Sequence, residues 1–208
     1  MKRIALLTLV STTLLISNIT QAQDVPVVGK FIPKPDLGLK IGANFNQLSD
    51  NGGSFKKAYK PGILFGAFGG VHWKKVGIRV EAMVNSASYT YSYTSTQDGT
   101  FKNLYLDVPV LFEYRLIPRV WLQVGPQFSD LIGVTANPNP DPANSPKSYF
   151  NSSDISGVLG LEVRLPLHLI VGARYILGFS NINNQSVSGD TNAWNTRTIQ
   201  LFAGFRFL

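Results

Sequence analysis

VGIRVEAMVN, residues 76–85, alternates apolar side chains with positions that are mostly glycine, charged or polar. A period of two predicts a β-strand, because successive side chains of a strand point to opposite faces of the sheet. The same period recurs at 37–45, 104–113, 120–129, 155–165, 169–178 and 198–207. An eighth strand, 62–73, is apolar on one parity and rich in glycine on the other. No helical 3.6-residue period persists, so we predict an all-β chain.

The composition limits the class of protein. The chain has 208 residues, of which 44% are hydrophobic and only 15% are charged, against ~25% charged residues in an ordinary soluble domain. The apolar content excludes a disordered chain. The absence of cysteine excludes disulfide scaffolds, zinc fingers and iron–sulfur sites. The net charge of +7 is spread along the sequence without a basic patch, so we expect no nucleic-acid partner.

The first residues have the three parts of a secretory signal peptide. Lys2 and Arg3 are positive, residues 4–16 are apolar, and small residues follow at 20–22. The apolar run is too short for a membrane-spanning helix, which needs ~20 apolar residues. We therefore predict a cleaved signal peptide at 1–22, an extended, proline-containing lead-in at 23–35 and a single barrel domain at 36–208.

The connections between the predicted strands alternate between short and long. Tight turns are expected at 74–75, 117–118 and 166–168, and long polar loops at 46–61, 87–102, 130–153 and 181–196. This alternation is typical of outer-membrane barrels, which have short periplasmic turns and long external loops. Each strand of ~9–13 residues is long enough to cross a bilayer when tilted. The sequence therefore predicts an eight-stranded antiparallel up-and-down transmembrane β-barrel, with both termini at the periplasmic rim.

The polar parity of the strands is expected to face the lumen. A soluble lipocalin-type barrel would reverse this, but its small interior could not hold the apolar side chains of eight strands. Glycine on an inner wall also leaves room for a neighbouring long side chain, whereas on a solvated face it would only weaken the strand. Aromatic side chains form two groups at the strand ends, as at the two interfaces of a bilayer. The charged residues expected inside are Lys40, Arg79, Glu81, Asp107, Glu113, Arg115, Glu162, Arg164, Arg174 and Arg206.

Four segments resemble strands of PorT-like outer-membrane β-barrels, which are common in Bacteroidota. YLDVPVLFEY at 105–114 resembles the strand YLEIPLLLKY of that family, and QVGPQ at 123–127 resembles the strand that follows it. VGARYILG at 171–178, continuing to residue 182, and DLGLKIGAN at 36–44 resemble two further strands. The resemblance covers residues 36–208 and implies an outer-membrane barrel without shared enzyme chemistry. The protein that gives the family its name is linked to a secretion system, which implies an accessory role in secretion as an alternative function.

No group of residues in the sequence predicts a catalytic, cofactor or metal site. His72 and His168 both lie at short-turn ends without a carboxylate at ligand spacing, so we interpret them as rim or interfacial residues. The inward charges could line an ion path, but an eight-stranded barrel has no room for a water channel. We therefore favour a closed polar plug, in which cations and carboxylates pair. Pro109 and Pro126 fall within strands and are expected to mark bulges.

The expected function is that of a small outer-membrane barrel that is not an enzyme and uses no cofactor. It would act as a structural or interaction module through its external loops, toward one of which Tyr89, Tyr91 and Tyr93 extend a strand. Its expected partners are the outer-membrane bilayer and a protein bound by the loops, and it is expected to be a monomer. The alternatives are the secretion accessory and a soluble ligand-binding barrel.

Overall fold

The computed structural model describes residues 33–50, 58–92, 98–138, 145–188 and 191–207, which form one β-barrel. The predicted signal peptide at 1–22 and nearly all of the predicted lead-in at 23–35 lie outside these residues. The strands are β1 (Lys34–Asp50), β2 (Lys60–Trp73), β3 (Val76–Ser92), β4 (Asp98–Ile117), β5 (Val120–Asn137), β6 (Ser153–Arg164), β7 (Leu169–Gly178) and β8 (Trp194–Arg206). Two short helices, η2 (Pro146–Tyr149) and α2 (Gln185–Ser188), follow β5 and β7.

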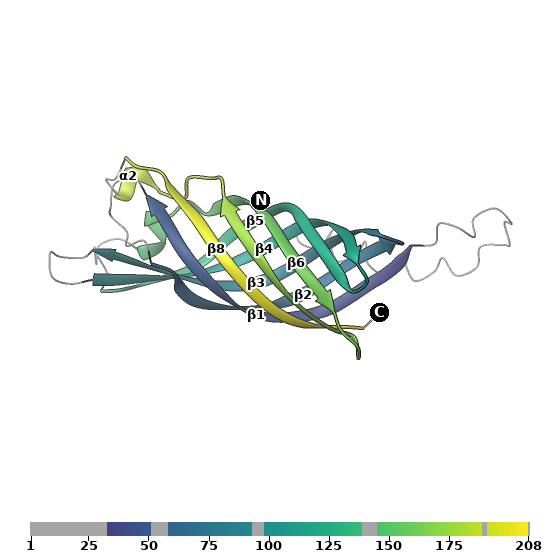
Figure 1. The fold of residues 1–208 in the computed structure, drawn as a ribbon. Helices are drawn as coiled ribbons and strands as arrows, with labels where there is room; N and C mark the ends of the chain where they lie inside the picture. The colour runs from purple at the N-terminus through teal and green to yellow at the C-terminus, as the bar shows by residue number, and fades with distance from the viewer. Residues whose placement is uncertain (1–32, 51–57, 93–97, 139–144, 189–190, 208) are drawn as a thin grey trace, which may run out of the picture. The chain divides into compact units, whose positions relative to one another are not determined.

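The strands form a closed ring in the order of the sequence. Each strand pairs antiparallel with the next, and β1 pairs with β8, so no sheet edge is left open. Figure 1 shows the strands crossing the barrel obliquely, with the chain running back and forth between two ends. The predicted eight-stranded antiparallel up-and-down barrel is confirmed.

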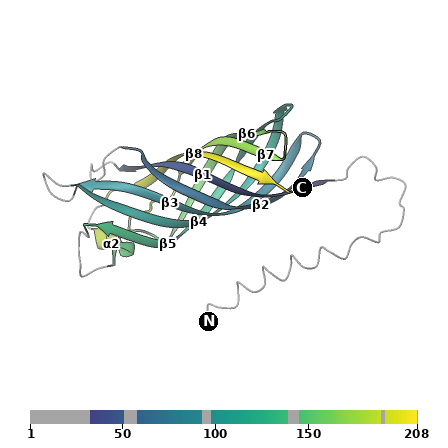
Figure 2. The ribbon, with the colours of Figure 1, turned by 90° about the horizontal axis from the view of Figure 1, so that it is seen from below.

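The two ends of the barrel differ in their connections. At the short-turn end, β2–β3, β4–β5 and β6–β7 are joined by tight turns, at which Lys74, Arg119 and Leu167 have positive φ. Positive φ at such turns matches the twist of the strands that they join. At the other end, called here the long-loop end, η2 and α2 lie over the strand ends (Figure 2).

Several strands continue beyond the predicted limits into the expected loops at the long-loop end. β3 reaches Ser92, β5 reaches Asn137 and β8 begins at Trp194. In this part of β3 the alternation is reversed, because Ala87 and Tyr89 point inward and are buried while Ser88 points outward. A strand with apolar residues inside and polar residues outside lacks the pattern that identified the rest of the barrel.

The outer face of the wall is apolar over the middle of the strands. Ile41, Leu159 and Leu201 have relative exposures of 65%, 56% and 47%. Aromatic side chains are exposed near both ends of the strands, with Phe112, Tyr114, Phe205 and Phe207 toward the short-turn end and Phe45, Phe65, Phe128 and Phe179 toward the other. This distribution agrees with the two predicted aromatic belts. Among the described residues, no helix has the length and apolar character needed to cross a membrane.

The prediction of bulges at the two strand prolines is wrong. Pro109 pairs with Gln127, and Pro126 pairs with Gly157, without a change of register. The register shifts between β4 and β5 lie instead at 104–105 and 115–117. A proline removes one ladder donor but adds no residue to the strand, so the pairing on either side of it keeps its register.

Candidate functional site

The lumen holds the buried charges of the described residues and is the candidate functional site. We divide it into three layers, in order from the short-turn end. The ion-pair layer comprises Asp36, Lys40, His72, Arg79, Glu81, Glu113, Gln123, Glu162, Arg164, Arg174 and Arg206. The polar layer comprises Asn46, Asn85, Asp107, Gln127, Ser129, Asp154, Ser156, Thr196 and Thr198. The aromatic cap comprises Leu48, Ala87, Tyr89, Tyr91, Phe101, Tyr105, Leu131, Phe150, Ile182 and Trp194.

Arg79 on β3 joins several walls of the lumen in the ion-pair layer. Its guanidinium donates to Glu162 at 2.5 and 3.0 Å and to Asp36 at 2.6 Å. A Glu113 oxygen lies 3.3 Å from the same guanidinium, and all four side chains have 0% relative exposure. A buried charge is costly unless it is paired and hydrogen-bonded, and here each charge has such partners.

Glu81, also on β3, forms a second group of charges. Arg174 donates two parallel hydrogen bonds to its carboxylate, at 2.7 and 2.8 Å, and Lys40 donates a third at 2.6 Å. Arg174 also donates to Gln123 at 2.8 Å, and the Lys40 ammonium lies 3.9 Å from the centre of the Phe202 ring. The bidentate Arg174–Glu81 pair fixes both side chains in one geometry.

His72 lies inside the lumen, so the interpretation of it as a rim residue is wrong. It is 7% exposed, hydrogen-bonds Glu113, and packs edge-on against Trp121 at 4.8 Å. In β2, residue 72 has the same parity as Leu64 and Phe68, which are both buried. The His72 side chain therefore also points into the lumen. His168 is exposed at the turn between β6 and β7, as expected.

Asp36, His72 and Glu113 bring potential metal-ligand atoms within 4.8 Å of one another. The carboxylates already accept hydrogen bonds from guanidinium groups: Arg206 and Arg79 donate to Asp36 at 2.6 Å each, and Arg164 donates to Glu113 at 2.9 Å. Three positive groups around these oxygens repel a cation. The cluster is therefore part of the ion-pair layer rather than a metal centre.

The sequence identified most of the inward charges but missed two acids. Lys40, Arg79, Arg174, Glu81, Asp107, Glu113 and Glu162 are buried inside as predicted, and Arg115, Arg164 and Arg206 are half-buried. Asp36 and Asp154 are also buried, at 1% and 5% exposure. Asp36 has the same parity as Lys40, which was a usable signal. Asp154 lies between the expected loop 130–153 and the strand predicted from residue 155, and the structure places it in β6. The set predicted to face the lumen has six cations and four carboxylates, and these two acids bring the described inward charges to balance.

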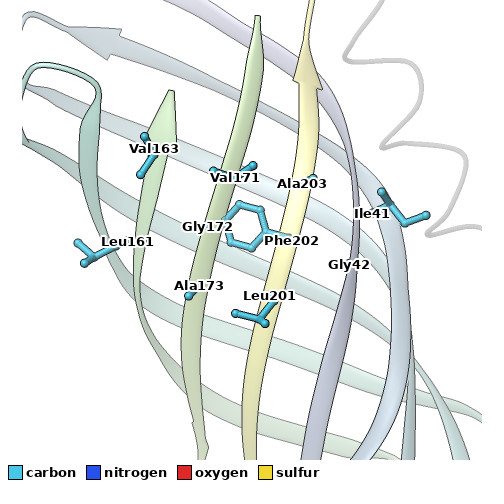
Figure 3. Close-up of a pocket in the computed structure, with 10 residues that line it drawn as sticks. All are labelled: Ile41, Gly42, Leu161, Val163, Val171, Gly172, Ala173, Leu201, Phe202 and Ala203. Carbon is cyan, nitrogen blue, oxygen red and sulfur yellow. The ribbon is translucent and has the colours of Figure 1, made fainter. Parts of the chain in front are cut away.

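Glycines on the inner wall make room for these large side chains. A Cβ at Gly160 would lie 2.5 Å from Cγ of Arg174, and one at Gly172 would lie 2.4 Å from the Phe202 ring. Figure 3 shows this ring beside Gly172, between β7 and β8. The prediction that glycine accommodates long neighbours on the inner wall is confirmed at both positions.

The polar layer contains uncharged amides and hydroxyls with two carboxylates. Asn85 donates to Asp107 at 2.9 Å and is itself bonded to Asn44. Across the lumen, Thr196 donates to Asp154 at 3.0 Å. The layer encloses a cavity of about 20 Å³. This space can hold about one water or ion, because a water needs ~10–15 Å³ on this scale.

The aromatic cap closes the long-loop end of the lumen. Phe101 packs against Tyr91 at 4.5 Å and against Phe150 at 5.1 Å, and Phe150 packs against Trp194 at 5.8 Å. Tyr89 and Tyr91 thus point into the barrel mouth rather than toward an external partner. Tyr93 lies outside the described residues.

Two of the loops expected to be irregular bring residues into this cap. Phe150 forms a β-bridge with Asn183, and Asn151 donates its backbone N–H to the Ile182 carbonyl at 2.8 Å. The expected loop 130–153 therefore contributes a buried aromatic residue from a stretch without an apolar pattern. Its proline-rich composition gave no signal for this contact.

An open apolar depression lies on the outer wall over β6, β7, β8 and β1 (Figure 3). Ala173 and Ala203 form its floor among larger neighbours such as Leu161, Leu201 and Ile41, which are exposed. It presents no polar group positioned to orient a ligand. Side chains of this kind on an exposed wall fit the acyl chains of a surrounding bilayer.

Comparisons with known proteins give one family match and several similar solved structures. The family model described as "Outer membrane protein beta-barrel domain" matches residues 21–184. Among solved structures, Ail of Yersinia pestis, in complex with the heparin analogue sucrose octasulfate, is 16% identical, with a TM-score of 0.49, covering 84% of this chain and 99% of Ail. OprG of Pseudomonas aeruginosa is 14% identical, with a TM-score of 0.48, covering 86% and 98%.

Neisserial surface protein A is 10% identical, with a TM-score of 0.47, covering 82% of this chain and 97% of its own. No curated protein matches the sequence. The family match spans more than half of the chain and agrees with its closed ring of strands, apolar outer wall and polar lumen. The chain therefore belongs to the outer membrane protein beta-barrel domain family and is a small barrel of the outer membrane.

Proposed function

We propose that the protein is a sealed outer-membrane barrel that serves as a structural and interaction module, and that it is neither a pore nor an enzyme. The single observation that carries the proposal is the filling of the lumen at two separate levels. The ion-pair layer spans the barrel between opposite walls, and the aromatic cap covers the long-loop end. An eight-stranded barrel has an interior just wide enough for its own side chains, so these fillings leave no continuous path.

The loops over the cap provide the surface through which the protein acts. Their backbone is held by side-chain amides: Asn184 donates to the Ser148 carbonyl at 2.7 Å, and Asn183 to the Asn192 carbonyl at 2.7 Å. Asn151 donates to the Asn181 and Asn183 carbonyls at 2.9 and 3.1 Å. A surface that is ordered before binding loses less conformational entropy when a partner docks. This supports a protein partner at the outer surface of the membrane, bound by a monomeric barrel.

The PorT-like resemblance supports the barrel wall more than a role in secretion. The matching segments at 36–44, 105–114 and 123–127 lie within β1, β4 and β5, and the fourth begins in β7 at residue 171 and continues past its end to residue 182. None of them reaches η2 or α2, which form the surface over the cap. We therefore do not propose secretion as a second function.

Conductance and cross-linking measurements test the two parts of the proposal. Purified protein in planar bilayers should give no single-channel steps, and regular steps would contradict the sealed lumen. A photo-cross-linking residue at Lys147 or Ser186, both exposed over the cap, should give a discrete adduct in intact cells. The same residue at Arg119 or Leu167, exposed at the short-turn end, should not give that adduct. Failure of both outer positions to give an adduct would contradict the interaction role.

A further inference from the structure

Two buried carboxylates lie on the same face of the wall in the polar layer. Asp107 on β4 and Asp154 on β6 are both ladder partners of Ser129 on β5, so the three side chains form one inward-facing row. Asp107 is 1% exposed and Asp154 is 5% exposed. None of the described residues that line the cavity beside them is basic. The carboxylates of the ion-pair layer, in contrast, each have a cation within hydrogen-bond distance.

Three polar side-chain atoms of residues that line this cavity have no hydrogen-bond partner among the described residues. They are the oxygens Oδ1 of Asp154 and Oε1 of Gln127 and the nitrogen Nδ2 of Asn46. The other polar atoms of these side chains are engaged, because Oδ2 of Asp154 accepts from Thr196 at 3.0 Å and Gln127 donates to Ser129 at 3.2 Å. Gln127 is 4% exposed, so bulk water does not reach either oxygen freely. Buried acceptors without partners are rare in native proteins and call for a bound water or ion.

The ligand that would satisfy this site can be specified by its chemistry. The available donors are carboxylate, amide and hydroxyl oxygens, a set that suits hard cations such as Ca²⁺ and Mg²⁺ rather than transition metals. The two carboxylates carry a combined charge that one divalent ion neutralises. The cavity of about 20 Å³ has room for one such ion and not for an organic molecule.

We propose that the polar layer binds one hard divalent cation, with the charge and size of Ca²⁺. Asp154 and Gln127 provide the two free oxygens, and Asp107 provides the second carboxylate. Ca²⁺ tolerates irregular sets of oxygen ligands better than Mg²⁺, which demands an octahedron. The site lies between the ion-pair layer and the aromatic cap, so the ion would be enclosed when the cap folds. It would neutralise a pair of like charges for which none of the described residues lining the cavity supplies a cation.

Because the cap covers the site, the ion must be supplied during refolding. The full chain is refolded in detergent with either 1 mM CaCl₂ or EDTA, with ionic strength matched by a choline salt. Heat-modifiable gel mobility then gives the melting temperature of each sample. We expect the calcium sample to melt roughly 5 °C or more above the EDTA sample if 1 mM is about a hundred times Kd. If instead a proton on one aspartate removes the repulsion between the two carboxylates, the two melting temperatures should be equal.

Substitutions assign the effect to these residues. Asp154→Asn and Asp107→Asn should abolish the calcium-dependent shift, and both keep the shape of the side chain. Asp130→Asn is the matched control, because Asp130 follows the row on β5 but is exposed and outside the cavity. It should keep the full shift.

Terbium gives a direct readout of occupancy. Tyr89 and Tyr105 line the same cavity, so excitation of tyrosine should sensitise Tb³⁺ luminescence in protein refolded with TbCl₃. Excess Ca²⁺ present during refolding should suppress the signal, with saturation at one Tb³⁺ per chain. If either asparagine variant fails to refold, the titration of the unmodified protein still decides. Equal melting temperatures with and without Ca²⁺, or a shift that persists in Asp154→Asn, would overturn the proposal.

Discussion

Arg79 on β3 and Glu162 on β6 face each other across the lumen and share two hydrogen bonds, of 2.5 and 3.0 Å. Neither strand neighbours the other in the ring, so the pair spans the interior instead of following the wall. The pair therefore both fills the lumen and ties together strands that have no backbone contact.

Removal of one member of this pair should destabilise the barrel without opening it. Glu162→Ala leaves Arg79 buried beside its remaining partners, Asp36 and Glu113, and should lower the free energy of unfolding by about 3 kcal/mol. Urea unfolding in lipid vesicles, followed by gel mobility, measures the loss. Glu162→Gln keeps a hydrogen-bonding group and should cost less. Stability equal to that of the unmodified protein in Glu162→Ala would show that the pair is not needed.

Lys40 and Arg174, which both bond the Glu81 carboxylate, should contribute unequally to the free energy of unfolding. Both bond Glu81, but Arg174 donates two hydrogen bonds to it and a third to Gln123, whereas Lys40 donates one. Lys40→Met should therefore cost about 1 kcal/mol or less, and Arg174→Met about 3 kcal/mol or more. Denaturant titrations of the two variants side by side measure the order. The reverse order would contradict the assignment of Arg174 as the main partner.

The aromatic cap should depend on a glycine beneath one of its rings. A Cβ at Gly99 would lie 2.2 Å from the Tyr91 ring, so Gly99→Val should displace this ring and loosen the cap. Faster proteolysis at the long-loop end of reconstituted barrels is the expected result. Gly69→Val is the matched control, because the nearest atom to a Cβ there lies 3.8 Å away. Equal cleavage rates in the two variants would contradict the packing described for the cap.

A looser cap should still not produce a pore. Phe150→Ala combined with Trp194→Ala removes two rings of the cap but leaves Arg79 and Arg174 across the lumen. Planar-bilayer recordings should therefore show no added conductance. Steady channel activity in this double variant would mean that the cap is the only barrier and that the ion-pair layer lets ions through.

The apolar wall predicts a depth-dependent cost for a charge. Leu159 lies near the middle of β6 and is 56% exposed on the outer face, so Leu159→Arg should cost roughly 2–4 kcal/mol in a bilayer. Leu167→Arg, at a turn where the side chain is 83% exposed, should cost close to nothing. Unfolding measurements in vesicles compare the two. Equal costs would contradict the placement of β6 across the membrane.

The membrane-facing part of the fold could be predicted from the sequence because one rule governs it. Between the aromatic belts, the outward positions are mostly apolar and the inward positions are mostly polar, charged or glycine, although large apolar residues such as Phe68, Leu111 and Phe202 also point inward. The same period indicates the inward direction of Arg79, Glu81 and Glu162. This pattern is confined to the strand segments between the aromatic belts, which face the bilayer. Beyond it, Tyr89 and Phe101 turn inward while Ser88 and Lys102 turn outward. The strand ends and the cap therefore show the opposite pattern, which the sequence alone does not distinguish from a polar loop.

The contacts across the lumen could not be predicted, because they depend on the three-dimensional stagger of the strands. Along one strand, Glu162 lies two residues from Arg164 on the same face, a spacing that is visible in the sequence, and the two side chains pair at 3.2 Å. The partner of Arg79 on the far wall has no signal in local sequence. Asp36 and Asp154 were missed for a different reason. Each lies at the margin of a predicted strand, outside the stretch in which the alternation was recognised.

The span of the ion-pair layer along the sequence has a consequence for how the barrel assembles. Arg206 donates to Asp36 at 2.6 Å across 170 positions, and Arg79 reaches Glu162 across 83. A partly assembled sheet, with β8 not yet joined to β1, would leave Asp36 without Arg206 and turn unmatched charges toward lipid. Release of an incomplete barrel into the membrane is therefore penalised, and charge neutralisation inside coincides with joining of the first and last strands.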